Sequence, residues 1–138
     1  MLRDAANIYS TNQAVTTTAV STDVVDHQAA GTLARSELRA VATVAVAFAG
    51  GTSIQAVFQT SSTENFASPV NLITGPVVPL ASAVAGAILL DAPIPDGNLR
   101  YTRFSYTVVG TMTAGQVDAA LVEESPNYAT YNDAVTVF

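Results

Sequence analysis

The chain has 138 residues, of which 49% are hydrophobic and 12% are charged, and its formal net charge is -6. This length fits one domain with a substantial core, and the apolar content excludes a disordered chain. Cys and Lys are both absent, so disulfide frameworks and Cys-ligated metal sites are excluded, and nucleic-acid binding is not expected of an acidic chain without a basic run.

Residues 1–13 are predicted to form a polar N-terminal arm in which Ile8 and Tyr9 are isolated anchors. Residues 14–20 are rich in β-branched side chains and predict a first strand. Residues 21–26 continue it as a second short strand or a bent extension. Residues 27–36 lack periodicity, which predicts a loop.

Residues 38–48 are ambiguous, because Ser36 could cap a helix while the apolar side chains alternate between two parities. The alternation, with Leu38 and Phe48 on the same parity, favours a strand. A Gly50-Gly51-Thr52 turn and a second alternating run then predict a hairpin over residues 38–59.

The segment 60–68 is predicted as a polar loop with one apolar anchor, Phe66. Short strands are predicted at residues 69–73 and 87–90, and residues 77–80 are predicted to be extended at a sheet edge, where proline is tolerated. Residues 91–98 combine two prolines with an Asp-Gly dipeptide and predict a loop.

The stretch from Arg100 to Glu124 is the part around which we expect the fold to be organised. Its first half alternates strictly and places Phe104 and Tyr106 on one face, where they are predicted to join the core. The segment from Gly110 to Gly115 separates it from a second alternating run, which predicts a long antiparallel hairpin.

About eight short strands without a clear helix predict an all-β fold, namely a jelly-roll or Greek-key β-sandwich of antiparallel strands. We expect one domain over residues 1–138, with the arm at 1–13, a jelly-roll core at 14–124 and a C-terminal tail at 125–138. The apolar end of the tail, residues 134–138, is suited to act as a contact arm. Neither a signal peptide nor a membrane span is recognisable in the sequence.

Residues for catalysis are sparse. His27 is the single histidine. A surface histidine beside aspartates such as Asp23 and Asp26 usually has no catalytic role. The pair Glu123-Glu124 is better explained as a solvated strand end than as an acid/base pair. We therefore expect no catalytic residue, no metal ligand and no cofactor, and predict that the chain is not an enzyme.

The two arginines of the 100–124 stretch leave two interpretations open. In the first interpretation, Arg100 and Arg103 bind an acidic surface of a partner. In the second, they form salt bridges within the protein at the edge of the sheet. Tyr101 lies on the parity opposite to the core aromatics, which makes it a candidate contact residue. The predicted partner interface consists of Ile8, Tyr9, Arg100, Tyr101, Arg103, Tyr128, Tyr131 and Phe138.

Several short stretches also recur in a known family. They are residues 14–16 and 21–26, residues 58–61 followed by Phe66, and residues 99–101, 106–108 and 113–117. In order and spacing they resemble the capsid cement (decoration or staple) proteins of short-tailed bacteriophages with HK97-type shells. The resemblance covers roughly residues 1–124, and the chain departs from it at residues 81–90 and after Glu124.

This resemblance implies a jelly-roll protein on the outer capsid surface of the virion, made in the host cytoplasm and lacking catalysis and cofactors. It would bind at two-fold or quasi-two-fold axes, usually as a homodimer, and clamp neighbouring subunits of the major capsid protein. The alternative is a carbohydrate-binding β-sandwich module of a virion surface or tail protein. Such modules usually expose aromatic residues, often Trp, and the chain has no Trp.

Overall fold

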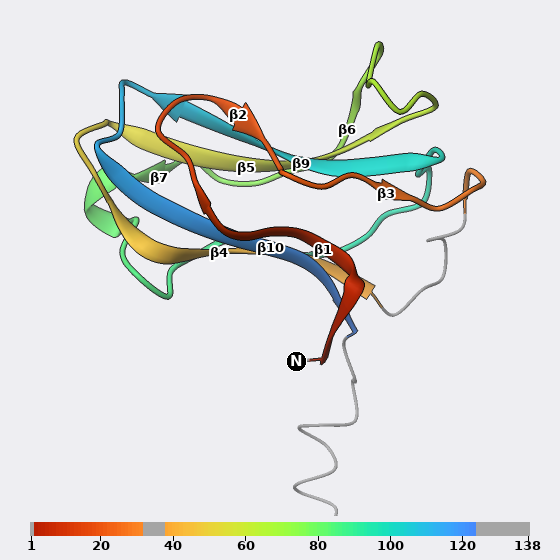
Figure 1. Ribbon diagram of the computed structural model, residues 1–138, viewed down its shortest axis with the longest axis horizontal. Coiled ribbons are helices and arrows are strands. Elements are labelled where there is room, and N and C mark those ends of the chain that lie inside the picture. Colours follow the sequence, from red (N-terminus) through yellow and green to blue (C-terminus); the bar gives the residue numbers. More distant parts are fainter. Residues whose placement is uncertain (1, 32–37, 124–138) are drawn as a thin grey trace, which may run out of the picture.

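The computed structural model describes residues 2–31 and 38–123, with side chains for residues 8–31 and 38–122. Ten strands form two antiparallel sheets that lie face to face (Figure 1). Sheet A contains β1 (Leu2–Ala14), β4 (Leu38–Ala49), β8 (Ile88–Pro93) and β10 (Ala114–Glu123). Sheet B contains β2 (Ala19–Val20), β3 (Val25–Asp26), β5 (Ser53–Ser61), β6 (Val70–Thr74), β7 (Val78–Pro79) and β9 (Tyr101–Val109).

The strand order is that of a jelly roll. Sheet A has the order β1-β10-β4-β8, and sheet B has the order β2-β9-β5-β6, with β3 also on β9 and β7 also on β5. Because β2 and β3 share one edge of β9, and β6 and β7 share one edge of β5, the ten strands fill eight positions. The predicted all-β jelly-roll sandwich is confirmed. A 3-10 turn, η1 (Leu80–Ser82), follows β7.

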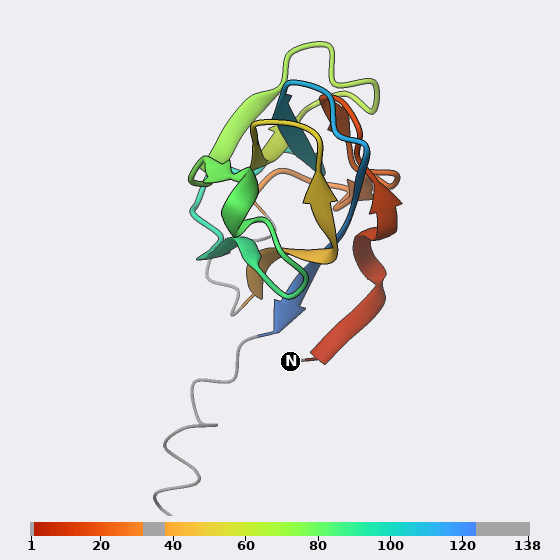
Figure 2. The ribbon, with the colours of Figure 1, turned by 90° about the vertical axis from the view of Figure 1, so that its left-hand side faces the viewer.

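Both predicted hairpins are wrong. Strand β4 belongs to sheet A and β5 to sheet B, so residues 38–59 cross the sandwich, and β9 and β10 do the same over residues 100–124. The two crossing segments lie together at one end of the sandwich (Figure 2). Thr52 N donates to Val109 O at 2.8 Å, and Thr113 N donates to Ala49 O at 2.7 Å. The alternation is genuine, but it does not specify which strand is the partner.

The N-terminal segment is a strand rather than an arm. Strand β1 is an edge of sheet A and pairs antiparallel with β10, with three register shifts along the pairing. The predicted strand over residues 14–20 is also wrong, because Ala14 ends β1 and pairs with β10, and only Ala19–Val20 of the remaining residues pairs, with β9. Val15 N instead donates to Gly115 O at 3.2 Å where the chain leaves sheet A.

Smaller boundary changes affect the remaining elements. Of residues 21–26, only Val25–Asp26 forms a strand, and β8 extends to Pro93, into the predicted loop at 91–98. The strands predicted at 38–48 and 53–59 are confirmed and are slightly longer. No helix in the described ranges is long and apolar enough to span a bilayer.

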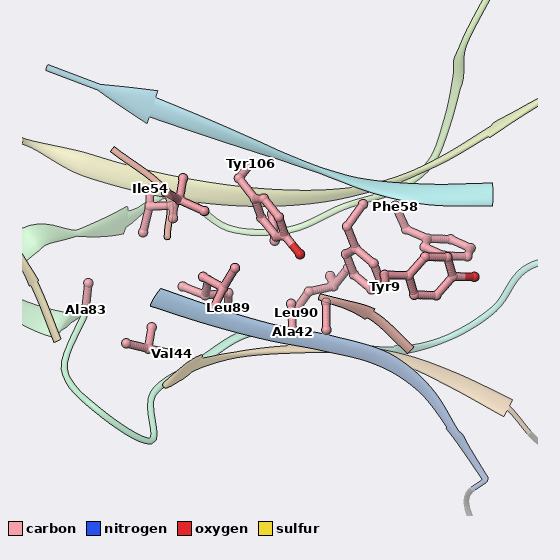
Figure 3. Packing of buried hydrophobic residues seen from close by; sticks show 14 of the residues in the cluster. Tyr9, Ala42, Val44, Ile54, Phe58, Ala83, Leu89, Leu90 and Tyr106 are labelled. Atoms are coloured by element: carbon pink, nitrogen blue, oxygen red, sulfur yellow. The ribbon is translucent and has the colours of Figure 1, made fainter. Parts of the chain in front are cut away.

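The core lies between the sheets (Figure 3). It contains a cluster of four aromatic rings. Phe104 packs edge-on against Tyr9 and Phe58, with both centroid distances at 5.2 Å, and stacks with Tyr106 at 6.4 Å. Phe104 and Tyr106 are fully buried, as the alternation of β9 predicted. Ring contacts of this kind stabilise beyond the apolar area that they bury.

Candidate partner interface

Arg103 lies on the outer face of sheet B. In β9 the side chains of Thr102 and Phe104 point into the core, so the intervening Arg103 points outward. Its Nε donates to Gln59 Oε1 at 3.0 Å, and its guanidinium lies 4.1 Å from the centroid of the Phe66 ring. Gln59 is the β5 residue directly opposite Arg103 in the antiparallel register.

Arg100 forms an ion pair within the protein. Its Nε and Nη2 donate to the two carboxylate oxygens of Asp26 at 2.8 Å and 2.9 Å. This contact is the largest reason why the pKa of Asp26 falls to about 2 and that of Arg100 rises. Arg100 also lies 5.1 Å from the ring centroid of Tyr101, which is half-buried. The salt-bridge interpretation is therefore confirmed for Arg100, whereas Arg103 has no carboxylate partner among the described side chains.

Tyr9 is not available to a partner. Its side chain is fully buried, and its hydroxyl lies 2.6 Å from Thr102 Oγ1, so it joins β1 to β9 across the core. Burial raises the pKa of the Tyr9 phenol above its usual range. The prediction of a contact residue at Tyr9 fails because β1 is part of the folded sandwich.

Ile8 lies on the opposite face of the sandwich from Arg103. It is half-buried and packs on Val41, Ala120 and Val122, which form a second apolar cluster. Val41 and Ala120 are paired neighbours in sheet A, and Ala119 and Leu121 on either side of Ala120 point into the core, so this cluster is on the outer face of sheet A. The structure thus does not gather the predicted contact residues on one surface. Tyr128, Tyr131 and Phe138 lie outside the described residues.

A model of the Bbp16 family, a bacteriophage protein family, matches residues 9–121 of the chain. The chain belongs to the Bbp16 family. The match spans the sandwich from β1 to β10. The expected relationship to bacteriophage proteins is confirmed at this level, and the family match itself does not state a role on the capsid. No curated protein matches the chain.

Exposed aliphatic side chains are a further feature of this Bbp16-family protein, and they were not predicted from the sequence. Val46, Val84 and Ile88 are 43%, 51% and 57% exposed. The segment carrying Val84 runs beside β4, because Phe48 N donates to Ala83 O and Gly86 N donates to Val44 O. Val84 and Ile88 lie in the segment 81–90, where the chain departs from the resemblance to capsid cement proteins.

His27 is held by a hydroxyl rather than by a carboxylate. Its Nε2 lies 2.8 Å from Thr102 Oγ1, the same atom that contacts the Tyr9 hydroxyl. Burial lowers the pKa of His27, against the opposing charge of Asp26. Within residues 2–31 and 38–123, no three His, Cys, Asp or Glu side chains are grouped as metal ligands would be.

The described aromatic side chains offer little surface for sugar stacking. Six of them are buried and Tyr101 is half-buried. The buried ones are Tyr9, Phe48, Phe58, Phe66, Phe104 and Tyr106. The geometry therefore gives no support to the carbohydrate-binding alternative.

Proposed function

We propose that this Bbp16-family protein is a structural virion protein that binds the outer surface of the assembled phage capsid and staples adjacent subunits of the major capsid protein. The observation that carries this proposal is the match of a bacteriophage family to almost the whole jelly roll, residues 9–121. The resemblance to capsid cement proteins noted in the sequence supplies the specific role.

Two properties of the sandwich support a bridging role. Its two outer faces differ in chemistry, with an apolar cluster around Ile8 on sheet A and Arg103 on sheet B. A rigid β-sandwich with contacts on opposite faces can join two neighbouring subunits. Once one contact is made, the second is intramolecular and gains from a high effective concentration, so weak individual contacts suffice.

The protein would act as a homodimer at two-fold axes on the capsid exterior. Contact with the packaged genome is not part of this role, because a chain with a net charge of -6 repels a polyanion. Sedimentation equilibrium of the purified protein tests the dimer independently of capsid binding.

Co-sedimentation with empty capsids of the same phage tests the stapling role. The purified chain is mixed with capsids before and after expansion. We expect saturable binding to expanded capsids at a fixed ratio to the major capsid protein, together with greater resistance of these capsids to heat. Absence of binding at high protein excess would exclude the role and make a sugar-binding assay the next step.

A further inference from the structure

Arg103 is the described arginine without a carboxylate partner. Among the side chains in residues 8–31 and 38–122, Arg39 pairs with Asp91 at 2.7 Å and Arg100 pairs with Asp26 at 2.8 Å. For Arg103 the described contacts are the Gln59 amide and the Phe66 ring. Its charge is therefore not neutralised within the described part of the molecule.

The guanidinium is nevertheless held in place. Gln59, which accepts from Arg103 Nε, donates through its own Nε2 to Asn71 Oδ1 at 3.0 Å. These three side chains form a row across β6, β5 and β9. Because Nε is used by Gln59 and the ring of Phe66 covers one face, the donors that remain are the two terminal amino groups. They form a fork that matches the two oxygens of a carboxylate.

Phe66, which packs on the Arg103 guanidinium, has a backbone conformation with positive φ. It comes from the connection between β5 and β6, which rises above sheet B (Figure 1). Its φ is 52°, which is rare for a bulky residue, and its side chain is only 5% exposed. The turn is held by Phe66 N donating to Thr63 O at 3.1 Å and by Ala67 N donating to Asn65 Oδ1 at 3.2 Å. Strain of this kind persists where the surroundings enforce it, and it is common in binding loops.

The neighbours of Arg103 along β5 and β9 on the outer face of sheet B have neutral side chains. Its outward neighbours on β5 and β9 are Val57 and Ser105, followed by Gln55 and Thr107. Desolvation is the sole cause of the lowered pKa of Arg103, whereas the pKa of Arg100 is raised by Asp26. Arg103 has no counter-charge among the described side chains, so an incoming carboxylate would supply the charge-assisted contact that its terminal amino groups lack.

We propose that Arg103, held over the ring of Phe66, receives an aspartate or glutamate side chain of the capsid partner, so that the outer face of sheet B is one of the faces that meet the capsid. This inference rests on the proposed capsid-binding function. The attraction is local, because the net charge of -6 opposes long-range attraction of an acidic partner. The contact therefore provides register and residence time more than speed of association.

Binding of substituted proteins to expanded capsids tests this proposal. Losing a forked, charge-assisted contact in Arg103→Gln should weaken binding about 10- to 100-fold. Arg103→Lys keeps the charge and the long stem but lacks the fork, so its affinity should lie between those of Arg103→Gln and the wild type. The matched control is Arg100→Gln, whose exposed guanidinium already has Asp26, and it should bind within about threefold of the wild type.

The capsid side of the contact is tested by amidating its carboxylates with a carbodiimide and methylamine. Amidation should weaken wild-type binding toward the level of Arg103→Gln and should leave binding of Arg103→Gln nearly unchanged. A cooperative thermal unfolding transition shows that each variant is folded. If Arg103→Gln does not fold, Arg103→Lys replaces it in the comparison with the wild type.

Equal binding of the wild type and Arg103→Gln, or of the wild type to native and amidated capsids, would overturn the assignment of Arg103 and leave the stapling role intact. Absence of wild-type binding would overturn both.

Discussion

Replacing Tyr9 distinguishes a strand from a flexible arm in the N-terminal segment. The Tyr9 side chain is fully buried and contacts Phe58 and Phe104 edge-on, at centroid distances of 5.9 Å and 5.2 Å. Truncating a buried aromatic residue to alanine costs about 3–5 kcal/mol, and the lost hydroxyl contact with Thr102 adds about 1 kcal/mol. Thr102 keeps His27 as a partner, so it is not left without a hydrogen bond. We therefore expect Tyr9→Ala to lower the free energy of unfolding by about 4–6 kcal/mol.

Urea unfolding followed by far-UV circular dichroism, at one protein concentration, measures this change. With a slope of about 2 kcal/mol per molar urea, the midpoint should fall by about 2–3 M. Tyr9→Phe keeps the ring and should cost only about 1 kcal/mol. Ile8→Ala is the neighbouring control and should have a smaller effect than Tyr9→Ala, because Ile8 is half-buried on the outer face. A Tyr9→Ala protein within about 0.5 kcal/mol of the wild type would show that β1 is detached in solution.

Three further predictions follow from local geometry. At Gly115, where φ is 139°, an added Cβ would lie 2.6 Å from Phe48 Cγ. Gly115→Ala should therefore lower the free energy of unfolding by about 2–4 kcal/mol. In thermal unfolding, adding Phe48→Leu should offset part of this loss, whereas additive effects of the two substitutions would contradict the contact. Burial lowers the pKa of His27 below its ordinary 6.5, so the unfolded chain binds a proton more readily than the folded chain. The free energy of unfolding should therefore be constant above about pH 6.5 and fall below it. His27→Gln should abolish that fall, and a flat wild-type curve down to about pH 5 would contradict the prediction. Arg100 lowers the pKa of Asp26 from 3.8 to about 2. The stabilisation from this ion pair should therefore be present above pH 3.8 and be lost toward pH 2. Arg100→Gln should remove this pH dependence from acid unfolding curves, and an unchanged curve would argue against the pair.

The local pattern of the sequence determined which side chains of a strand face inward. Phe104 and Tyr106 are buried in β9 as the alternation predicted, because successive side chains in a strand point to opposite faces. The absence of Cys and the scarcity of charged residues likewise restricted the fold to one stabilised by packing. The all-β jelly-roll class follows from such local signals, and the structure confirms it.

Strand pairing was decided only by the tertiary structure. The segments after β4 and β9 have glycines that suit a hairpin, yet both cross between the sheets. Alternation is identical for a strand that pairs with its neighbour in sequence and for one that pairs with a distant strand, because it reflects only the two faces of the strand. The same limit affected Tyr9, whose isolated apolar character indicated an anchor but not that β10 would pair with its strand.

The difference between the two arginines has the same physical origin. Arg100 and Arg103 are three residues apart and were equivalent in the sequence, where both interpretations applied to each. In the folded chain, pairing places Asp26 opposite Tyr101 and within reach of Arg100, while it places the neutral Gln59 opposite Arg103. Composition determined that the chain has few cations. The register of three strands from distant parts of the chain decided that Arg100 has a carboxylate partner and that Arg103 has none among the described residues.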